Sequence, residues 1–193
     1  MKTKILFVFL LIGSLSACDI LQQVTEMQQL SLCTFDLNGV DQVKLAGIQL
    51  RPGMEKSGLT VSESLTLAGA IFNKSLPLQM NMMVKVDNPN EKKASLNKMD
   101  YILFVDGKEL ISGMVQEKFE INGGSSLMLA LPMSLDLYKV LQNETSDALV
   151  NLAFKLVSDK GQPTEVMLKI KPYLKIGSSE LVYPGFLTLS KDL

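Results

Sequence analysis

The 193-residue sequence contains no histidine and no tryptophan, and these two absences narrow its function. Histidine is the side chain whose unperturbed pKa best suits acid–base catalysis near neutral pH, and it is the commonest metal ligand. Without it the chain cannot form a serine–histidine or cysteine–histidine relay, nor a zinc site built on imidazole. We therefore predict a protein that is not an enzyme and that carries no metal or other cofactor.

The charged residues also lack a concentration of one sign. The chain has 19 Lys and Arg against 20 Asp and Glu, so its formal net charge is −1. Because no basic stripe is present to neutralise phosphates, no nucleic-acid partner is predicted. Hydrophobic residues make up 47% of the chain, which is enough for the core of one ordinary domain.

The hydrophobic run at the N-terminus is too short to be a membrane span. It covers the eight residues Ile5 to Ile12 and follows the positive residues Lys2 and Lys4. As a helix, eight residues extend roughly 12 Å, whereas the hydrocarbon core of a bilayer is about 30 Å thick. This pattern is typical of an export signal.

The end of that signal, Leu15-Ser16-Ala17-Cys18, resembles the lipobox of bacterial lipoproteins at every position. The resemblance implies cleavage between Ala17 and Cys18, diacylation of the Cys18 thiol and acylation of the new amine. Residues 1–17 are then a lipoprotein signal peptide, and the glutamine-rich residues 18–32 are a lipidated N-terminus and tether. The alternative is a simple secreted protein with a chance cysteine.

The predicted partner of this N-terminus is a membrane, reached through the lipid. Each buried CH₂ contributes about 0.8 kcal/mol, and more than one acyl chain gives stable attachment. Without residues 1–17, 17 basic and 20 acidic residues remain, so charge supplies no attraction to anionic headgroups. We expect the protein in the bacterial cell envelope, at the outer membrane rather than the inner membrane. Asp19 argues for the inner membrane, because an aspartate directly after the lipidated cysteine retains lipoproteins there in some enteric bacteria.

Cys33 is then the one free thiol, and it is expected as a small buried residue at the start of the first strand of a domain covering residues 33–193. The clearest helix follows at Thr60, which with Glu63 fits a capping box. Val61, Leu65, Ala68 and Phe72 form one stripe of that helix, which ends before Pro77.

Most of the remaining chain reads as strands. The predicted strands and turns are an alternating strand over 76–86, a strand over 99–105, a two-residue turn at Asp106-Gly107, a partner strand over 108–121, a strand over 127–135 and a final hairpin over 164–190. Asp136 could cap a short helix. Residues 146–157 fit either a helix or a strand, and we expect this segment to begin as a helix and pass into a strand. The pattern predicts an antiparallel β-sandwich, immunoglobulin- or fibronectin III-like, with about seven strands and one or two short helices.

Acidic residues near the strand ends are the remaining catalytic candidates. Asp100 and Asp106 lie six residues apart on one strand, roughly 20 Å, whereas glycosidase carboxylates need about 5–9 Å. A pair between Asp87 and either of them stays geometrically open. Asn88-Pro89-Asn90 is expected to end a strand and redirect the chain, because proline donates no hydrogen bond and asparagine tolerates turn geometry.

Residues 76–140 resemble a late embryogenesis abundant type 2 domain, also called a WHy domain. The matching features are Asn88-Pro89-Asn90, a segment with Tyr101, Leu103, Val105 and Gly107, then Ser112-Gly113, and a later strand ending in Pro132. The resemblance implies a β-sandwich without known catalysis and a protective role toward proteins or membranes during water stress. Asn88, Pro89 and Asn90 match a signature that is structural. The lipobox and the methionine-rich strands depart from the family pattern.

The leading functional prediction is a non-enzymatic, membrane-anchored envelope lipoprotein with a protective or binding role in stress. One alternative is a ligand-binding or assembly accessory subunit of an envelope complex, whose protein partner is not identified by the sequence. An apolar groove between the sheets would favour ligand binding. The third is a carboxylate-based hydrolase, which the missing histidine argues against.

Overall fold

The computed structural model describes residues 28–158, 163–176 and 179–193, and these residues are mainly β. They contain eleven strands: β1 (Thr34–Leu45), β2 (Ile48–Gln49), β3 (Pro77–Asn88), β4 (Ala94–Leu96), β5 (Lys98–Val105), β6 (Lys108–Val115), β7 (Phe119–Ile121), β8 (Ser125–Asp136), β9 (Glu165–Ile176), β10 (Ser179–Val182) and β11 (Leu187–Asp192). The helices are the 3₁₀ turn η1 (Lys56–Gly58), α3 (Val61–Phe72), α4 (Leu137–Val140) and α5 (Ser146–Lys155).

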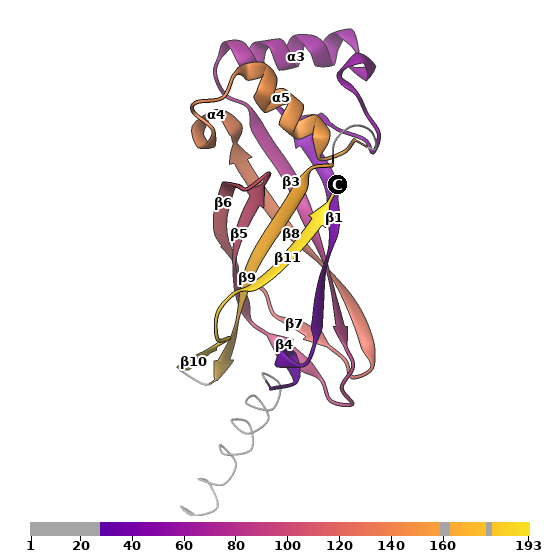
Figure 1. Ribbon diagram of the computed structural model, residues 1–193, viewed down its shortest axis with the longest axis vertical. Coiled ribbons are helices and arrows are strands. Elements are labelled where there is room, and N and C mark those ends of the chain that lie inside the picture. The colour runs from indigo at the N-terminus through magenta and orange to yellow at the C-terminus, as the bar shows by residue number, and fades with distance from the viewer. Residues whose placement is uncertain (1–27, 159–162, 177–178) are drawn as a thin grey trace, which may run out of the picture.

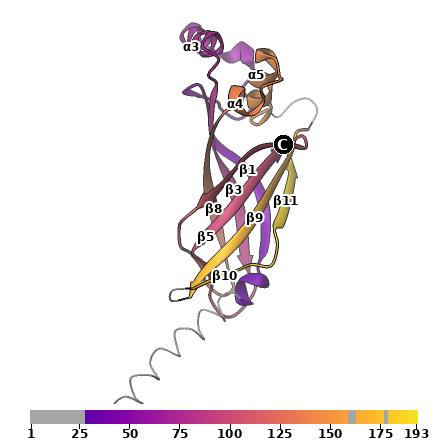
Figure 2. The same ribbon diagram turned by 90° about the vertical axis from the view of Figure 1, so that its left-hand side faces the viewer.

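The strands form two large sheets, and every strand pair in them is antiparallel. One sheet has the order β2-β1-β3-β8; the other has the order β10-β9-β5-β6, with β11 also paired to β9. Strands β4 and β7 form a small separate sheet. Seven strands are six residues or longer. The predicted antiparallel β-sandwich with short helices is confirmed (Figures 1 and 2).

The core lies between the two large sheets and is built by alternation along the strands. On β3 every second residue is buried, from Leu78 to Val86, and β5 shows the same period from Met99 to Val105. Inward residues of β9 complete the layer: Val166, Leu168, Ile170 and Leu174. Burying each large aliphatic side chain contributes about 1.5–3 kcal/mol, so this layer stabilises the pairing of the sheets.

Positive φ angles occur at a bulge and at a turn. Gly39 has φ of +114° at a register shift between β1 and β3, which is a bulge. Asp106 and Gly107 have φ of +47° and +74° and join β5 to β6, as a type I′ turn requires. The predicted turn at Asp106-Gly107 is therefore confirmed.

Helix α3 begins with the predicted capping box. The Thr60 hydroxyl accepts from the Glu63 N–H at 3.2 Å, and the Glu63 carboxylate accepts from the Thr60 N–H at 2.8 Å. The Asp136 carboxylate likewise accepts from Tyr138 N–H at the start of α4. However, the buried residue of α3 is Leu67, so the predicted apolar stripe of this helix faces outward.

Two predicted elements are wrong. Residues 146–157 do not pass into a strand; α5 is helical throughout Ser146–Lys155, because Leu149, Val150, Ala153 and Phe154 are buried with helical spacing. The partner strand over 108–121 is two strands in different sheets, since β6 pairs with β5 and β7 pairs with β4. The polar residues 116–118 between them interrupt the alternation.

The two ends of the sandwich differ in character. Residues 28–31, part of the predicted tether, form a helical turn beside β4 and β7 (Figure 1), and Leu30 in this turn is part of the core. The helices α3, α4 and α5 lie together at the opposite end (Figures 1 and 2). Within the described ranges, no helix has the length and apolar character needed to cross a membrane.

Candidate functional site

The predicted lipidation residue Cys18 and the cleavage residue Ala17 lie outside the described residues. The described chain begins at residue 28, and its first helical turn lies at the end of the sandwich formed by β4 and β7 (Figure 1).

The Asn-Pro-Asn segment sits at that same end, and Asn88 is its centre. Asn88 is only 2% exposed, and its side-chain amide donates to the carbonyls of Lys92 and Ile121, both at 3.0 Å. Its side-chain oxygen accepts from the Asn90 N–H at 3.1 Å. Asn88 thus ties the end of β3 to the following loop and to the end of β7.

Asn90 extends this network to the beginning of the described chain. Its side-chain amide donates to the Gln29 carbonyl at 3.0 Å, and its own carbonyl accepts from Gly124 N–H at 2.8 Å. Gly123 passes so close that a Cβ there would lie 2.2 Å from the Glu91 carbonyl oxygen. These polar groups hold the loops together, and both the nitrogen and the oxygen of the Asn88 side chain are hydrogen-bonded within the protein.

The three candidate carboxylates are each held by their own neighbours. Asp87 accepts from the Ser126 hydroxyl and from Lys85 at 2.9 Å. Asp100 accepts from the Tyr173 hydroxyl at 2.5 Å. Asp106 accepts from the Glu165 N–H at 3.2 Å, which fixes the turn between β5 and β6 against β9.

The electrostatics of Asp87 do not suit acid catalysis. The Ser126 hydroxyl and then Lys85 lower the pKa of Asp87, whereas a general acid needs a raised pKa. Among the residues that the structure describes, no group of three or more Cys, Asp or Glu side chains is arranged to hold a metal ion.

Cys33 directly precedes β1, as predicted, and is half-buried. Its thiol donates to the Gln29 carbonyl at 3.4 Å, and burial raises its pKa to about 11. Since the thiolate is the nucleophile, this thiol is inert near neutral pH.

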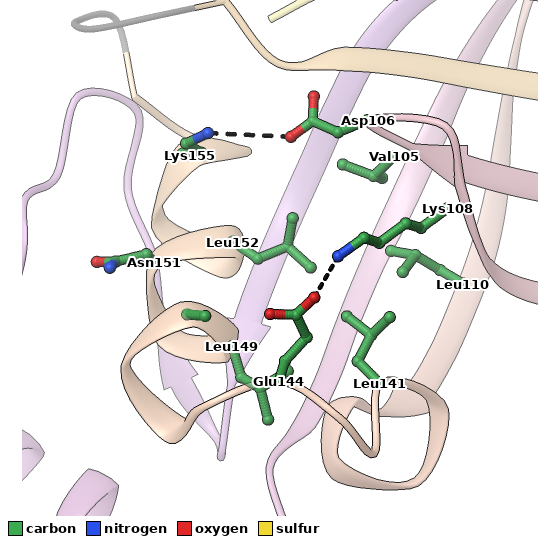
Figure 3. A pocket seen from close by; sticks show the side chains of 11 residues that line it. Val105, Asp106, Lys108, Leu110, Leu141, Glu144, Leu149, Asn151, Leu152 and Lys155 are labelled. Atoms are coloured by element: carbon green, nitrogen blue, oxygen red, sulfur yellow. Dashed lines mark hydrogen bonds and ion pairs between the residues drawn. The ribbon is translucent and has the colours of Figure 1, made fainter.

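A pocket of about 320 Å³ lies between the β5–β6 hairpin and helices α4 and α5 (Figure 3). Its apolar lining comes from Val105, Leu110, Leu141, Leu149 and Leu152. This volume is at the lower limit of small-molecule pockets, which span about 300–1,000 Å³.

The rim of the pocket is charged but balanced. Lys108 pairs with Glu144 across it, and Lys155 lies 3.9 Å from Asp106 (Figure 3). Two cations and two anions give the rim no net charge, so ligand selection would rest on the apolar lining. The sequence did not reveal this pocket, because part of α5 was predicted to be a strand.

Comparison with known proteins gives one family match. A family model described as late embryogenesis abundant protein matches residues 83–180, from the middle of β3 into β10. No curated protein sequence matches the chain.

Three solved structures resemble the chain. The crystal structure of a protein from Archaeoglobus fulgidus has 14% identity and a TM-score of 0.39, covering 80% of this chain and 96% of that one. The solution structure of a protein from Arabidopsis thaliana has 16% identity and a TM-score of 0.41, covering 63% and 73%. A third, described as a late embryogenesis abundant protein, has 13% identity and a TM-score of 0.39, covering 95% and 83%. At these scores the structural likeness carries no argument.

Proposed function

The chain belongs to the late embryogenesis abundant protein family, and on that premise we propose that it acts without catalysis as a lipid-anchored β-sandwich at a bacterial cell envelope, protecting or binding other molecules under stress. The observation that carries the proposal is the family match over residues 83–180. That region contains the Asn-Pro-Asn segment and all three candidate carboxylates.

The chemistry of the described residues supports a role without catalysis. Asp87 has a lowered pKa and Cys33 a raised one, so neither side chain is activated for reaction. The buried polar side chain of Asn88 is occupied in joining loops. Evidence against this part of the proposal would be an activity that Asp87→Asn or Asp106→Asn abolishes while the protein stays folded.

Anchoring is supported by the Leu15–Cys18 motif and by the start of the described chain, which lies at one end of the sandwich (Figure 1). The anchor is tested by growing cells with radiolabelled palmitate and recovering the protein. We expect label on the natural chain and on a Cys33→Ala control, and none on Cys18→Ala, because Cys18 carries all the acyl chains, on its thiol and its amine. Absence of label from the natural chain, or label on Cys18→Ala, would contradict the anchor.

For the location, we propose the outer membrane, with the sandwich in the periplasm. Separation of the two membranes on a density gradient should place the protein with outer-membrane markers. Recovery with inner-membrane markers that shifts to the outer membrane in Asp19→Ser would show that Asp19 acts as a retention signal.

A second candidate function is a ligand-binding or assembly accessory subunit of an envelope complex, and the pocket beside α5 favours it. Mild solubilisation followed by affinity purification tests this function. A stoichiometric partner lost from Leu152→Glu, which places a charge in the apolar lining, would support it. The matched control is Asn151→Glu, which adds the same charge to the neighbouring residue, whose side chain points away from the apolar lining (Figure 3).

A further inference from the structure

Apolar side chains are exposed at the end of the sandwich where the described chain begins. Strand β10 and the segment after it contribute Leu181, Val182 and Phe186, which are 37%, 40% and 45% exposed. Leu32, directly after the first helical turn, is 58% exposed. Figures 1 and 2 show β10 and that turn at the same end of the molecule, opposite α3. These four residues are called the basal residues below.

Strand β10 is apolar on both of its faces. It pairs with β9 on one side, and no strand within the described residues pairs with its other side. Val182 lies opposite Tyr173 on the outer face of the sheet, whereas Leu181 lies opposite the buried Leu174. Leu181 is therefore on the core-facing side but is not covered by the other sheet. Exposed apolar side chains on both faces of an edge strand indicate a surface that meets something apolar.

Lysine side chains lie over the aromatic rings beside β10. Lys171 Nζ is 5.7 Å from the centre of the Phe186 ring, and Lys98 Nζ is 4.5 Å from the centre of the Tyr173 ring. Lys98 also pairs with Glu180 at 2.7 Å, whereas no carboxylate among the described residues forms an ion pair with Lys171. A lysine beside exposed apolar and aromatic side chains is typical of the membrane–water interface, where the apolar part enters the acyl boundary and the ammonium group stays among the headgroups.

We propose that the basal residues contact the surface of the bilayer in which the lipid on Cys18 is inserted. The Phe186 ring and the β10 side chains lie at the boundary between headgroups and acyl chains, and Lys171 reaches the headgroup phosphates. Every phospholipid carries this phosphate, so the contact needs no excess of anionic lipid. The inference rests on the proposed lipid anchor and adds a second contact between the protein and the same membrane.

The length of chain that precedes the structure favours the bilayer as the occupant of this surface. Cys18 precedes residue 28 by ten positions, and ten residues span at most about 35 Å. The end with α3 lies farther than this from the chain start, because β3 alone, with 12 residues, spans roughly 40 Å. A lipid on Cys18 therefore brings the bilayer to the end that carries the basal residues.

The contact sets the orientation of the domain, whereas the lipid supplies the attachment. Four partly exposed side chains bury far less apolar surface in a bilayer than whole acyl chains do, so the basal residues alone do not hold the protein on a membrane. With this end on the bilayer, the helices α3, α4 and α5 and the pocket beside α5 point away from it (Figures 1 and 2).

The absence of tryptophan from the chain makes the contact directly measurable. Phe186→Trp places a single fluorophore among the basal residues, and the control Phe72→Trp places one at the opposite end, where Phe72 is 88% exposed. Each lipidated variant is purified from membranes and reconstituted on phosphatidylcholine vesicles with or without brominated acyl chains, which quench tryptophan by contact. We expect brominated vesicles to lower the fluorescence of Phe186→Trp by at least about twofold and to leave that of Phe72→Trp unchanged.

A charge on β10 tests whether its apolar side chains make the contact. Adding Val182→Asp to Phe186→Trp should remove most of the quenching, because a carboxylate is excluded from the acyl boundary. The matched control adds Val61→Asp, which places the same charge on α3 and should leave the quenching unchanged. Lys171→Glu should also weaken the quenching, because it sets an anion against the phosphates. Circular dichroism checks that each variant is folded.

Flotation of the vesicles separates this contact from the anchor. A chain that floats with the vesicles without quenching at position 186, as expected if a protein partner covers the basal residues, overturns the contact and leaves the anchor in place. Equal quenching at positions 186 and 72, quenching at position 72 alone, or quenching that survives Val182→Asp also overturns the contact. A chain that does not float contradicts the anchor, and the contact is then refuted with it.

Discussion

The hydrogen bonds of Asn88 allow its replacement by alanine to be worked out in detail. Asn88→Ala leaves the carbonyls of Lys92 and Ile121 and the Asn90 N–H without their partner. Each unsatisfied buried polar group costs about 1–3 kcal/mol. Water reaching this end of the sandwich will satisfy some of them, so we expect a loss of about 3–5 kcal/mol in the free energy of unfolding.

Such a loss is a large part of the roughly 5–15 kcal/mol that stabilises an ordinary domain. Urea unfolding followed by circular dichroism measures it as a lower midpoint with an unchanged slope. The matched control is Asn143→Ala, an exposed asparagine expected to change stability by less than about 0.5 kcal/mol. An Asn88→Ala variant within about 1 kcal/mol of the natural chain would refute the structural role. Lost function with unchanged stability would instead make Asn88 a functional residue.

Four further predictions concern single positions. Gly123→Ala should unfold at lower urea than the natural chain, because its Cβ would lie 2.2 Å from the Glu91 carbonyl; an unchanged midpoint would contradict that contact. Leu103→Ala should cost about 2–5 kcal/mol by urea unfolding, since Leu103 is fully buried between the sheets. The pKa of Asp87 is lower in the folded state than in the unfolded state, so the Asp87 carboxylate stabilises the fold fully above the unfolded pKa of about 3.9, and this stabilisation is lost as pH falls through the folded pKa. Asp87→Asn should therefore weaken the loss of stability at acid pH. An acid limb of the stability–pH curve identical to that of the natural chain would contradict this. Cys33, with a pKa of about 11, should react with a maleimide at pH 7.5 at least ~100-fold more slowly than an ordinary thiol, and fast labelling of the folded chain would disagree with its burial.

The features that sequence reasoning predicted correctly depend on neighbours in the chain. Thr60 and Glu63 are three residues apart, and Asp106-Gly107 is a dipeptide, so their geometry follows from local chemistry. The alternation in β3 and β5 is also local, which is why the antiparallel sandwich was predictable. Asn88 was correctly expected to end a strand, but its acceptors at Lys92 and Ile121 come from the folded loops.

The errors arose where distant segments decide the outcome. Strand β7 leaves the β5–β6 sheet because β4 offers it a partner, a pairing that no local pattern reveals. The α5 segment has apolar residues consistent with both periods, and burial against the domain selected the helix. The orientation of α3 could not be predicted either. The spacing of its apolar residues predicts a helix but does not show that Leu67, rather than the apolar stripe, packs on the domain.

The most direct test of the central claim is the mass of the N-terminal peptide of the protein purified from membranes. A lipid-anchored chain should begin at Cys18 and carry the mass of a diacylglycerol group on sulfur together with an acyl group on the amine. A chain that begins at another residue, or a Cys18 peptide of unmodified mass, would contradict the account.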